Sequence, residues 1–231
     1  MMENRQRVLS IRSSTISSAL DQCKFDPKEH KSKYVLDKIC RFGKYIDRDE
    51  VEKAPEFRQI VSCAVVYSDN RILCIRRTKK SNRRALALRW TVMIGGHVDD
   101  LDEGSKTPIL NCLLRELREE LGVIPVSVPE LIGIVYDPAT PVGRLHLGIV
   151  YKAKIASNQI RVSAIHDNSE FVNSDKNNVY SLIDYKQIIS LEREFDPWST
   201  LFLKSEVATT MLNSPRNIFP DNELALQWNL T

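Results

Sequence analysis

The pattern of apolar and polar positions is mixed over residues 1–56, and from residue 59 onward runs of apolar residues indicate β-strands. Residues 59–77 form two β-rich runs on either side of 68–70, a turn composition, which predicts a hairpin with Cys63 and Cys74 in its strands. A third apolar run, at 86–96, ends in the glycine pair Gly95-Gly96. Further strand-like runs lie at 8–11, 130–137 and 145–155.

Helical signals interrupt these strands. Thr107 is placed to cap a helix whose first residue is Pro108, and Gly122 is placed to end it. Two later segments, 181–195 and 198–212, also have a helical pattern. A mixed sheet with few helices predicts an α/β or α+β sandwich.

Composition narrows the class of protein without fixing its function. The chain has 231 residues, of which 42% are hydrophobic and 27% charged, so it is neither collagen-like nor wholly disordered. No apolar run approaches the ~20 residues that cross a bilayer. A net charge of +3 is too small to indicate nucleic-acid binding.

Cysteine and histidine spacing give no metal or disulfide signature. The five cysteines form no CxxC pair, and the four histidines are scattered without ligand spacing. We expect reduced thiols, and with no apolar stretch of a signal peptide at the N-terminus we expect a cytoplasmic protein.

The predicted helix at 108–121 carries the chemistry. Its leucines gather on one stripe, which must face a core. Glu116, Glu119 and Glu120 fall on the adjacent face, because positions three and four apart are neighbours. Crowded carboxylates repel one another, and a hard cation such as Mg²⁺ or Mn²⁺ removes that repulsion. The alternative is a solvated charged face on which Arg115 and Arg118 supply the partners.

Residues 115–123, Arg-Glu-Leu-Arg-Glu-Glu-Leu-Gly-Val, resemble the second half of the Nudix box, REUxEExGU with U aliphatic. The glycine pair upstream fits the same pattern. Over roughly 35–212 the chain is similar to a branch of predicted Nudix phosphoesterases related to MutT. The stretches that carry this wider similarity are DEVEKAPEFRQIV, RRTKK, GGHVD and DPATPVGRLHLGIVY.

This resemblance implies a Nudix fold, an α/β/α sandwich around a mixed β-sheet. It also implies Mg²⁺- or Mn²⁺-dependent hydrolysis of a nucleoside diphosphate linked to another moiety. By position, Glu116, Glu119 and Glu120 match the family's metal ligands, with the Gly96 carbonyl beside them. Arg115 matches the arginine that orients the cluster.

The general base is expected to be Glu116 or Glu119. Many Nudix enzymes use a further glutamate from a later loop as a ligand or base, and Glu170 is the candidate here. The box also departs from the family pattern. Eight residues before Arg115 the family has a glutamate, where this chain has Thr107, and the loop after Gly96 is five residues longer. Asp102 or Glu103 is expected to supply the missing carboxylate.

Basic residues outside the box are candidates for substrate binding. The run 76–84 contains six basic residues, among them Arg76 and Arg77, and is either a solvated loop or a loop that faces phosphate. Without interleaved aromatic residues it does not favour nucleic acid. Arg144 and His146 would share a face of one strand. They would either contact substrate or have a structural role. His97 would either donate to a phosphate oxygen or bond a loop carbonyl.

The expected organisation is an N-terminal extension, 1–56, packed on a Nudix hydrolase domain, 57–212, with a C-terminal tail, 213–231. No Gly/Ser/Pro linker separates the first two. The partner expected is a small nucleotide or related diphosphate, not a membrane, and the oligomeric state stays open, with a homodimer as one option. Two other functions stay open: a catalytically inactive Nudix module that senses a ligand or interacts, and a Nudix isomerase of an isoprenoid diphosphate.

Overall fold

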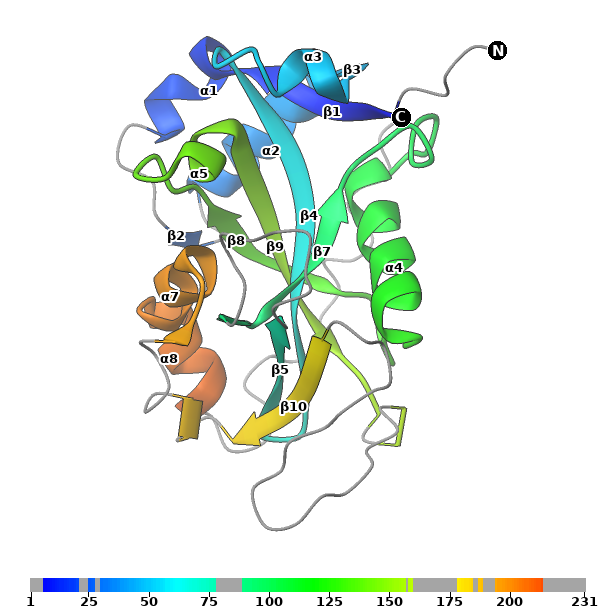
Figure 1. The fold of residues 1–231 in the computed structure, drawn as a ribbon, viewed down its shortest axis with the longest axis vertical. Helices are drawn as coiled ribbons and strands as arrows, with labels where there is room; N and C mark the ends of the chain where they lie inside the picture. The colour runs from blue at the N-terminus through cyan, green and yellow to red at the C-terminus, as the bar shows by residue number, and fades with distance from the viewer. Residues whose placement is uncertain are drawn as a thin grey trace.

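A computed structural model describes residues 6–20, 25–27, 30–77, 89–156, 158–159, 178–184, 187–188 and 194–213. Its strands form one mixed sheet with helices on both sides (Figure 1). The strands are β1 (Arg7–Arg12), β2 (Phe25–Pro27), β3 (Lys44–Asp47), β4 (Phe57–Ser68), β5 (Arg71–Arg77), β6 (Trp90–Thr91), β7 (Met93–His97), β8 (Glu130–Val135), β9 (His146–Lys154) and β10 (Asn178–Asp184). The helices are α1 (Ser13–Leu20), α2 (His30–Phe42), α3 (Arg48–Val51), α4 (Pro108–Leu121), α5 (Pro141–Leu145), α7 (Pro197–Leu203) and α8 (Glu206–Asn213).

The long strand β4 organises the sheet. It pairs in parallel with β9 and antiparallel with β1, β5 and β7. The main path of the sheet runs β10-β5-β4-β9-β8-β2. The α/β sandwich around a mixed sheet that the sequence predicts is therefore confirmed.

The side chains of β4 alternate between two cores. Ile60, Ala64 and Val66 pack in a cluster with residues of α1, α2 and α4, and we call this side of the sheet the α4 face. Cys63 and Val65 pack in a second cluster with Phe202 and Ala208 of α7 and α8, on the side that we call the α7 face. In Figure 1, α4 lies to the right of the sheet and α7 and α8 to the left.

Most elements agree with the predictions from the sequence. The hairpin of β4 and β5 turns at 68–71, where Ser68 pairs with Arg71, and it contains Cys63 and Cys74 as expected. The expected strands at 8–11, 130–137 and 145–155 correspond to β1, β8 and β9. The expected helix is α4, and the segment 198–212 forms two short helices, α7 and α8, in place of one.

The predicted helix at 181–195 is wrong at its start. Residues 181–184 belong to β10, which pairs with β5 over seven residues. Tyr180 and Leu182 lie in the α4-face core and Ile183 in the α7-face core. Because β10 is buried on both faces, its apolar residues do not alternate with polar ones, so the pattern does not distinguish a strand from a helix.

The N-terminal segment shares the main core. β1 pairs with β4 from Ser10↔Gln59 to Arg12↔Phe57. Ile16 of α1 and Val35 of α2 are fully buried in the α4-face cluster. These contacts place the segment on the sheet. In the described ranges, no helix is long and apolar enough to cross a membrane.

If the N-terminal segment is part of one cooperative unit, Ile16→Ala should destabilise the whole protein. Removing a fully buried isoleucine leaves a cavity that costs about 2–5 kcal/mol of unfolding free energy. Urea denaturation should show a single transition at a lower midpoint. Leu101→Ala, at a side chain that is 74% exposed, is the control and should change little. Two separate transitions, or a midpoint equal to the control's, would contradict this.

Candidate active site on α4

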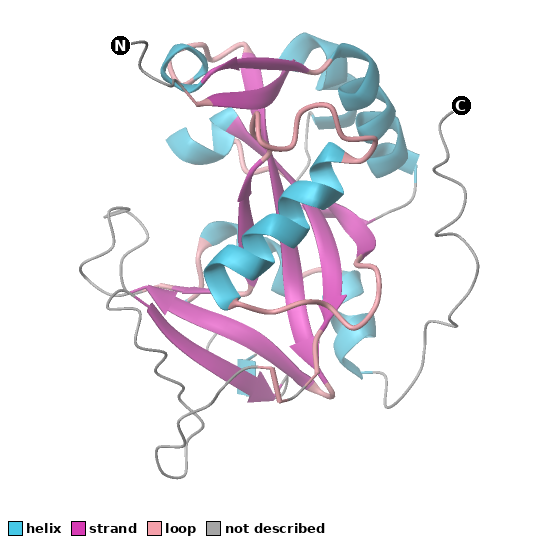
Figure 2. Cartoon of the chain, turned by 90° about the vertical axis from the view of Figure 1, so that its right-hand side faces the viewer, coloured by secondary structure: helices cyan, strands magenta, loops and turns pink. Residues whose placement is uncertain are grey.

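The helix α4 packs across one face of the sheet (Figure 2) and carries the glutamates of the predicted site. Leu113 and Leu117 are fully buried, and the helix ends where Gly122 adopts a left-handed φ of 65°. The Gly122 N–H donates to the Arg118 carbonyl at 2.9 Å. With the leucines fixed inward, Glu116 is half-buried at the sheet, while Glu119 and Glu120 are exposed beside it.

The helix begins where expected, without the expected capping bond. Thr107 occupies the N-cap position before Pro108, and its side chain makes no cap hydrogen bond. The Ser105 hydroxyl instead accepts from the Thr107 N–H at 3.1 Å and from the Asn111 side chain at 2.6 Å. Ser105 thus ties the start of the helix to the loop before it.

Gly96 of β7 lies directly against the Glu116 carboxylate. A Cβ atom at position 96 would stand 2.5 Å from the carboxyl carbon of Glu116, so any other residue would displace this side chain. The neighbouring Cys112 thiol donates to the His97 carbonyl at 3.2 Å. The glycine pair therefore allows the backbone of β7 to approach the acidic face of α4.

Arg115 joins the acidic groups of this region. Its Nη1 donates to Glu116 at 2.7 Å and to Glu119 at 3.3 Å. Its Nη2 donates to Asp102 at 2.9 Å and to Asp99 at 3.3 Å, and Nε donates to the other Asp102 oxygen at 3.4 Å. Burial opposes the charge, but the hydrogen bond to Asp102 and the surrounding carboxylates raise the pKa of Arg115 above its usual value.

Asp102, and not Glu103, contacts Arg115. Asp102 is 4% exposed and meets the guanidinium through both of its oxygens. It also accepts from the Asp99 N–H at 3.2 Å, which closes a tight turn. Glu103 lies at the surface and pairs with Arg7. The long loop therefore brings a carboxylate to the arginine from a position that the family spacing does not use.

The strand β1 binds the backbone of this loop. The sequence did not predict this contact. The Leu9 N–H donates to the Val98 carbonyl at 2.7 Å, and the Asp100 N–H donates to the Arg7 carbonyl at 3.1 Å. The Gln6 side chain donates to Asp99 at 3.0 Å. No motif in the N-terminal residues signals this role, because it depends on backbone pairing between distant segments.

Burial makes Glu116 electrostatically distinct. Burial is the largest cause of its raised pKa, and repulsion from Glu119 and Asp99 adds to it, whereas Arg115 lowers the pKa. A carboxylate with a raised pKa accepts a proton more readily than an ordinary one.

The donor set fits a hard divalent cation. In the described part of the chain, no three His, Cys, Asp or Glu side chains already converge as a metal site. Glu116 nevertheless lies against the Gly96 backbone, which a Cβ would block, with Glu119 and Glu120 about one turn further along. Carboxylate and carbonyl oxygens are the ligands that Mg²⁺ and Mn²⁺ prefer.

Comparison with known proteins identifies the family. The family model of the NUDIX domain matches residues 56–175, about half of the chain. The chain belongs to the Nudix family. It is therefore a Nudix-type hydrolase, of a family that acts on nucleoside diphosphate derivatives.

One of the similar solved structures shares the fold over most of this chain. Tm1382, a candidate Nudix hydrolase, has a TM-score of 0.68 at 20% identity, with 90% of this chain and 98% of that chain covered. The MutT protein from Methanosarcina mazei Go1 has a TM-score of 0.46 at 19% identity, covering 67% and 95%. A mutT/nudix family protein from Listeria innocua has a TM-score of 0.47 at 16% sequence identity, with 67% of this chain and 93% of that chain covered. No curated protein matches the chain.

Three of the predicted substrate residues of this Nudix domain, Arg76, His97 and His146, lie on the other side of the sheet. Gly96 pairs with Ser62 and faces α4, so the next residue of β7, His97, faces the α7 side. His146 pairs with Gln59 at the start of β9, also on the α7 side. The Cζ atom of Arg76 lies 5.8 Å from the centroid of the Trp90 ring, which belongs to the α7-face core.

His97 and His146 meet across β4. Their Nε2 atoms are 3.1 Å apart. His146 Nδ1 lies 2.6 Å from the Val142 carbonyl, which only accepts, so Nδ1 carries a proton. In the neutral His146, Nε2 then accepts, and the donor of the pair is His97 Nε2. The two rings therefore hold α5 beside β7.

The expectation that Arg144 and His146 share a strand face is wrong. Arg144 lies in α5, which begins after the Thr140 cap, and only His146 belongs to β9. Pro141 at the first helical position favours this short helix. The Arg77 side chain, the rest of the basic run to residue 84 and Glu170 lie outside the described residues.

The contact between Asp102 and Arg115 predicts unequal effects in the acidic loop. Asp102→Ala removes the bidentate partner of a mostly buried guanidinium and should lower the free energy of unfolding by about 1–3 kcal/mol. Glu103→Ala removes an exposed pair and should stay within about 0.5 kcal/mol of wild type. Urea denaturation of the two variants measures both values. Equal effects would show that Asp102 does not orient Arg115.

Proposed function

We propose that this Nudix domain cleaves a phosphoanhydride bond in a nucleoside diphosphate linked to another moiety, and that it needs Mg²⁺ or Mn²⁺. The observation that carries the proposal is the half-buried Glu116 carboxylate, held by Arg115 against the backbone of Gly96. A purely structural charged face has no need of a glycine at that contact, or of three crowded glutamates on one helix.

The proposed cation ligands are the Gly96 carbonyl and the carboxylates of Glu116, Glu119 and Glu120. When bound, a divalent cation would offset the charge of the phosphate oxygens and lower the pKa of an attacking water. Arg115 contacts Glu116 and Glu119 at once and so restricts both side chains before a cation arrives. We assign to Arg115 this positioning role.

Glu116 is the proposed general base. Burial raises its pKa, and its carboxylate lies against the backbone of Gly96. A raised pKa makes a carboxylate a better acceptor for the proton of the attacking water. Glu119 is the second choice, because it is exposed and its contact with Arg115 is longer, at 3.3 Å. Glu170 stays a proposal as a further ligand.

The substrate group beyond the diphosphate is proposed to contact the α7 face. Arg76, His97 and His146 lie on the side of the sheet opposite Glu116, and Arg144 is exposed on α5 beside them. Such placement suits contacts remote from the cleaved bond better than contacts to the reacting phosphates. Arg77 is proposed to belong to the same substrate-binding set.

The proposed setting is the cytoplasm, with a small molecule as substrate. The described cysteines, Cys40, Cys63, Cys74 and Cys112, are free thiols, which supports a reducing compartment. The small net charge supports a nucleotide-sized partner over nucleic acid.

A screen of nucleoside diphosphate derivatives tests the proposal. The purified protein is incubated with each compound and Mg²⁺ or Mn²⁺, and released phosphate or nucleotide is measured. At least one compound should be cleaved in the presence of cation and left intact in excess chelator. Binding without cleavage across the panel would favour a ligand-sensing module instead.

Glu116→Gln should separate activity from stability. Loss of the base should lower kcat about 10²–10⁴-fold. Because the raised pKa shows that ionisation of Glu116 opposes folding, its stabilising contribution exists at acid pH and is lost as pH rises through the folded pKa. The neutral amide escapes this loss, so without cation the variant should melt above wild type at pH 7, by a difference that shrinks at acid pH.

The exposed Glu103→Gln variant is the control and should match wild type in both measurements. Turnover by Glu116→Gln within about threefold of wild type would exclude Glu116 as the base.

Glu120→Gln should weaken cation binding and leave the fold intact. The side chain is exposed, so its replacement removes a ligand oxygen and little packing. Mn²⁺ titration followed by electron paramagnetic resonance should give an affinity about tenfold or more below wild type. Glu50→Gln, at an exposed glutamate of α3, should bind as wild type does. Unchanged binding by Glu120→Gln would remove Glu120 from the ligand set.

A further inference from the structure

A hollow of about 450 Å³ opens beneath α1, away from the acidic face of α4. Three serines of α1 line one wall, namely Ser13, Ser14 and Ser17, and Arg58 at the start of β4 lines another. Its volume lies within the ~300–1,000 Å³ of small-molecule sites. Neither Gly96 nor any box residue lines it.

Among the described residues that line the hollow, Arg58 is the one with a charged side chain. Arg58 Nη1 donates to the carbonyls of Pro55 and Phe57, at 2.7 and 2.8 Å. Among the described residues Arg58 has no ion pair, and its buried Nε has no hydrogen-bond partner. None of the lining residues that the structure describes is acidic. A partly buried arginine without a carboxylate favours an anion from outside.

The serine wall supplies hydroxyl donors beside this charge. The Ser13 N–H donates to the Glu56 carbonyl at 2.7 Å, which fixes the start of α1 close to the start of β4. Ser17 donates to the Ser14 carbonyl at 3.3 Å, a long bond that a stronger acceptor would displace. Hydroxyl groups with one arginine match the acceptor oxygens of a phosphate group.

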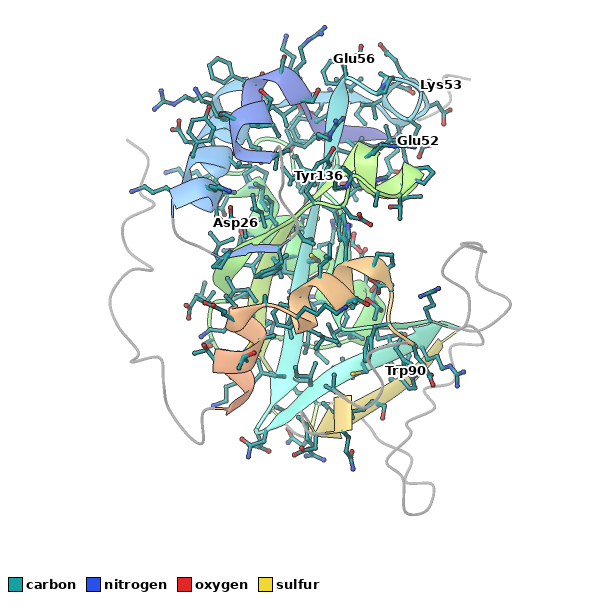
Figure 3. All side chains as sticks on the ribbon, turned by 90° about the vertical axis from the view of Figure 1, so that its left-hand side faces the viewer. Asp26, Glu52, Lys53, Glu56, Trp90 and Tyr136 are labelled. Carbon is teal, nitrogen blue, oxygen red and sulfur yellow. The ribbon has the colours of Figure 1, made fainter. Side chains whose placement is uncertain are left out.

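The remaining described lining residues have mainly apolar side chains. They are Tyr136, Leu20 and Pro138. The Arg58 guanidinium lies over the Tyr136 ring, with its carbon 5.5 Å from the ring centroid. Figure 3 shows Tyr136 below α1 and beside α5. A wall of this kind accepts the planar organic part of a small ligand next to a bound anion.

We propose that this hollow binds a phosphate monoester with a planar organic group, at a site separate from the box. The phosphate contacts Arg58 and the hydroxyls of Ser14 and Ser17, and the planar group lies against Tyr136 and Pro138. The site requires both the N-terminal segment, which provides α1, and the Nudix domain, which provides Arg58. It does not depend on the reaction that the box performs.

Two variants of α1 test the site without removing buried groups. Ser14→Asp places a negative charge in the hollow, and an acid near a helix N-terminus stabilises the helix, so folding is preserved. Ser18→Asp adds the same charge to an exposed position of α1 outside the lining and serves as control. Arg58→Met removes the cation and is checked for folding by its melting curve.

The probes are inorganic phosphate and phenyl phosphate, titrated in excess chelator and followed by backbone amide shifts. Saturable shifts should appear at residues 13–20 and at 136 and 137, at lower concentration for phenyl phosphate. Ser14→Asp should weaken them about tenfold or more, while Ser18→Asp stays within about twofold of wild type. Shifts confined to residues 95–97 and 115–120, or equal losses in both aspartate variants, would overturn the proposal.

Discussion

The candidate active site depends on one guanidinium placed among carboxylates. Arg115 bonds Asp102 and Asp99 on one side and Glu116 and Glu119 on the other. Four acids this close would repel one another without it, and a mostly buried arginine without them would be costly. Each side therefore requires the other. The acidic loop, the helix α4 and the end of β7 are held together by this shared charge balance.

The pleat of the sheet decides what can reach this cluster. Consecutive residues of β7 point to opposite faces, so Gly96 meets Glu116 while His97 meets His146. The acidic residues thus occupy one face and the histidine pair the other. In the proposed function, a substrate that contacts both groups would extend past the end of β7, with its reacting phosphates on the α4 face.

The sequence predicted correctly those elements whose structure depends on residues close together in the chain. The leucine stripe of α4, its end at Gly122 and the β4–β5 hairpin follow from spacing and turn chemistry. The strand β10 did not, because burial on both faces removes the alternation that marks a strand. For the site, the sequence limited the missing carboxylate to two neighbours. Only the turn of the loop distinguishes the buried Asp102 from the exposed Glu103.

The N-terminal segment belongs to the site for a physical reason. The NUDIX match begins at residue 56, yet β1 bonds the loop backbone at Val98 and Asp100, and Gln6 bonds Asp99. An acidic loop repels itself, and pairing with a neighbouring strand restricts the conformations that this repulsion would otherwise favour. Because a longer loop has more conformations to lose, the insertion before α4 needs such support. The longer loop and the strand β1 therefore depend on each other, because β1 restricts the conformations of the extra loop residues.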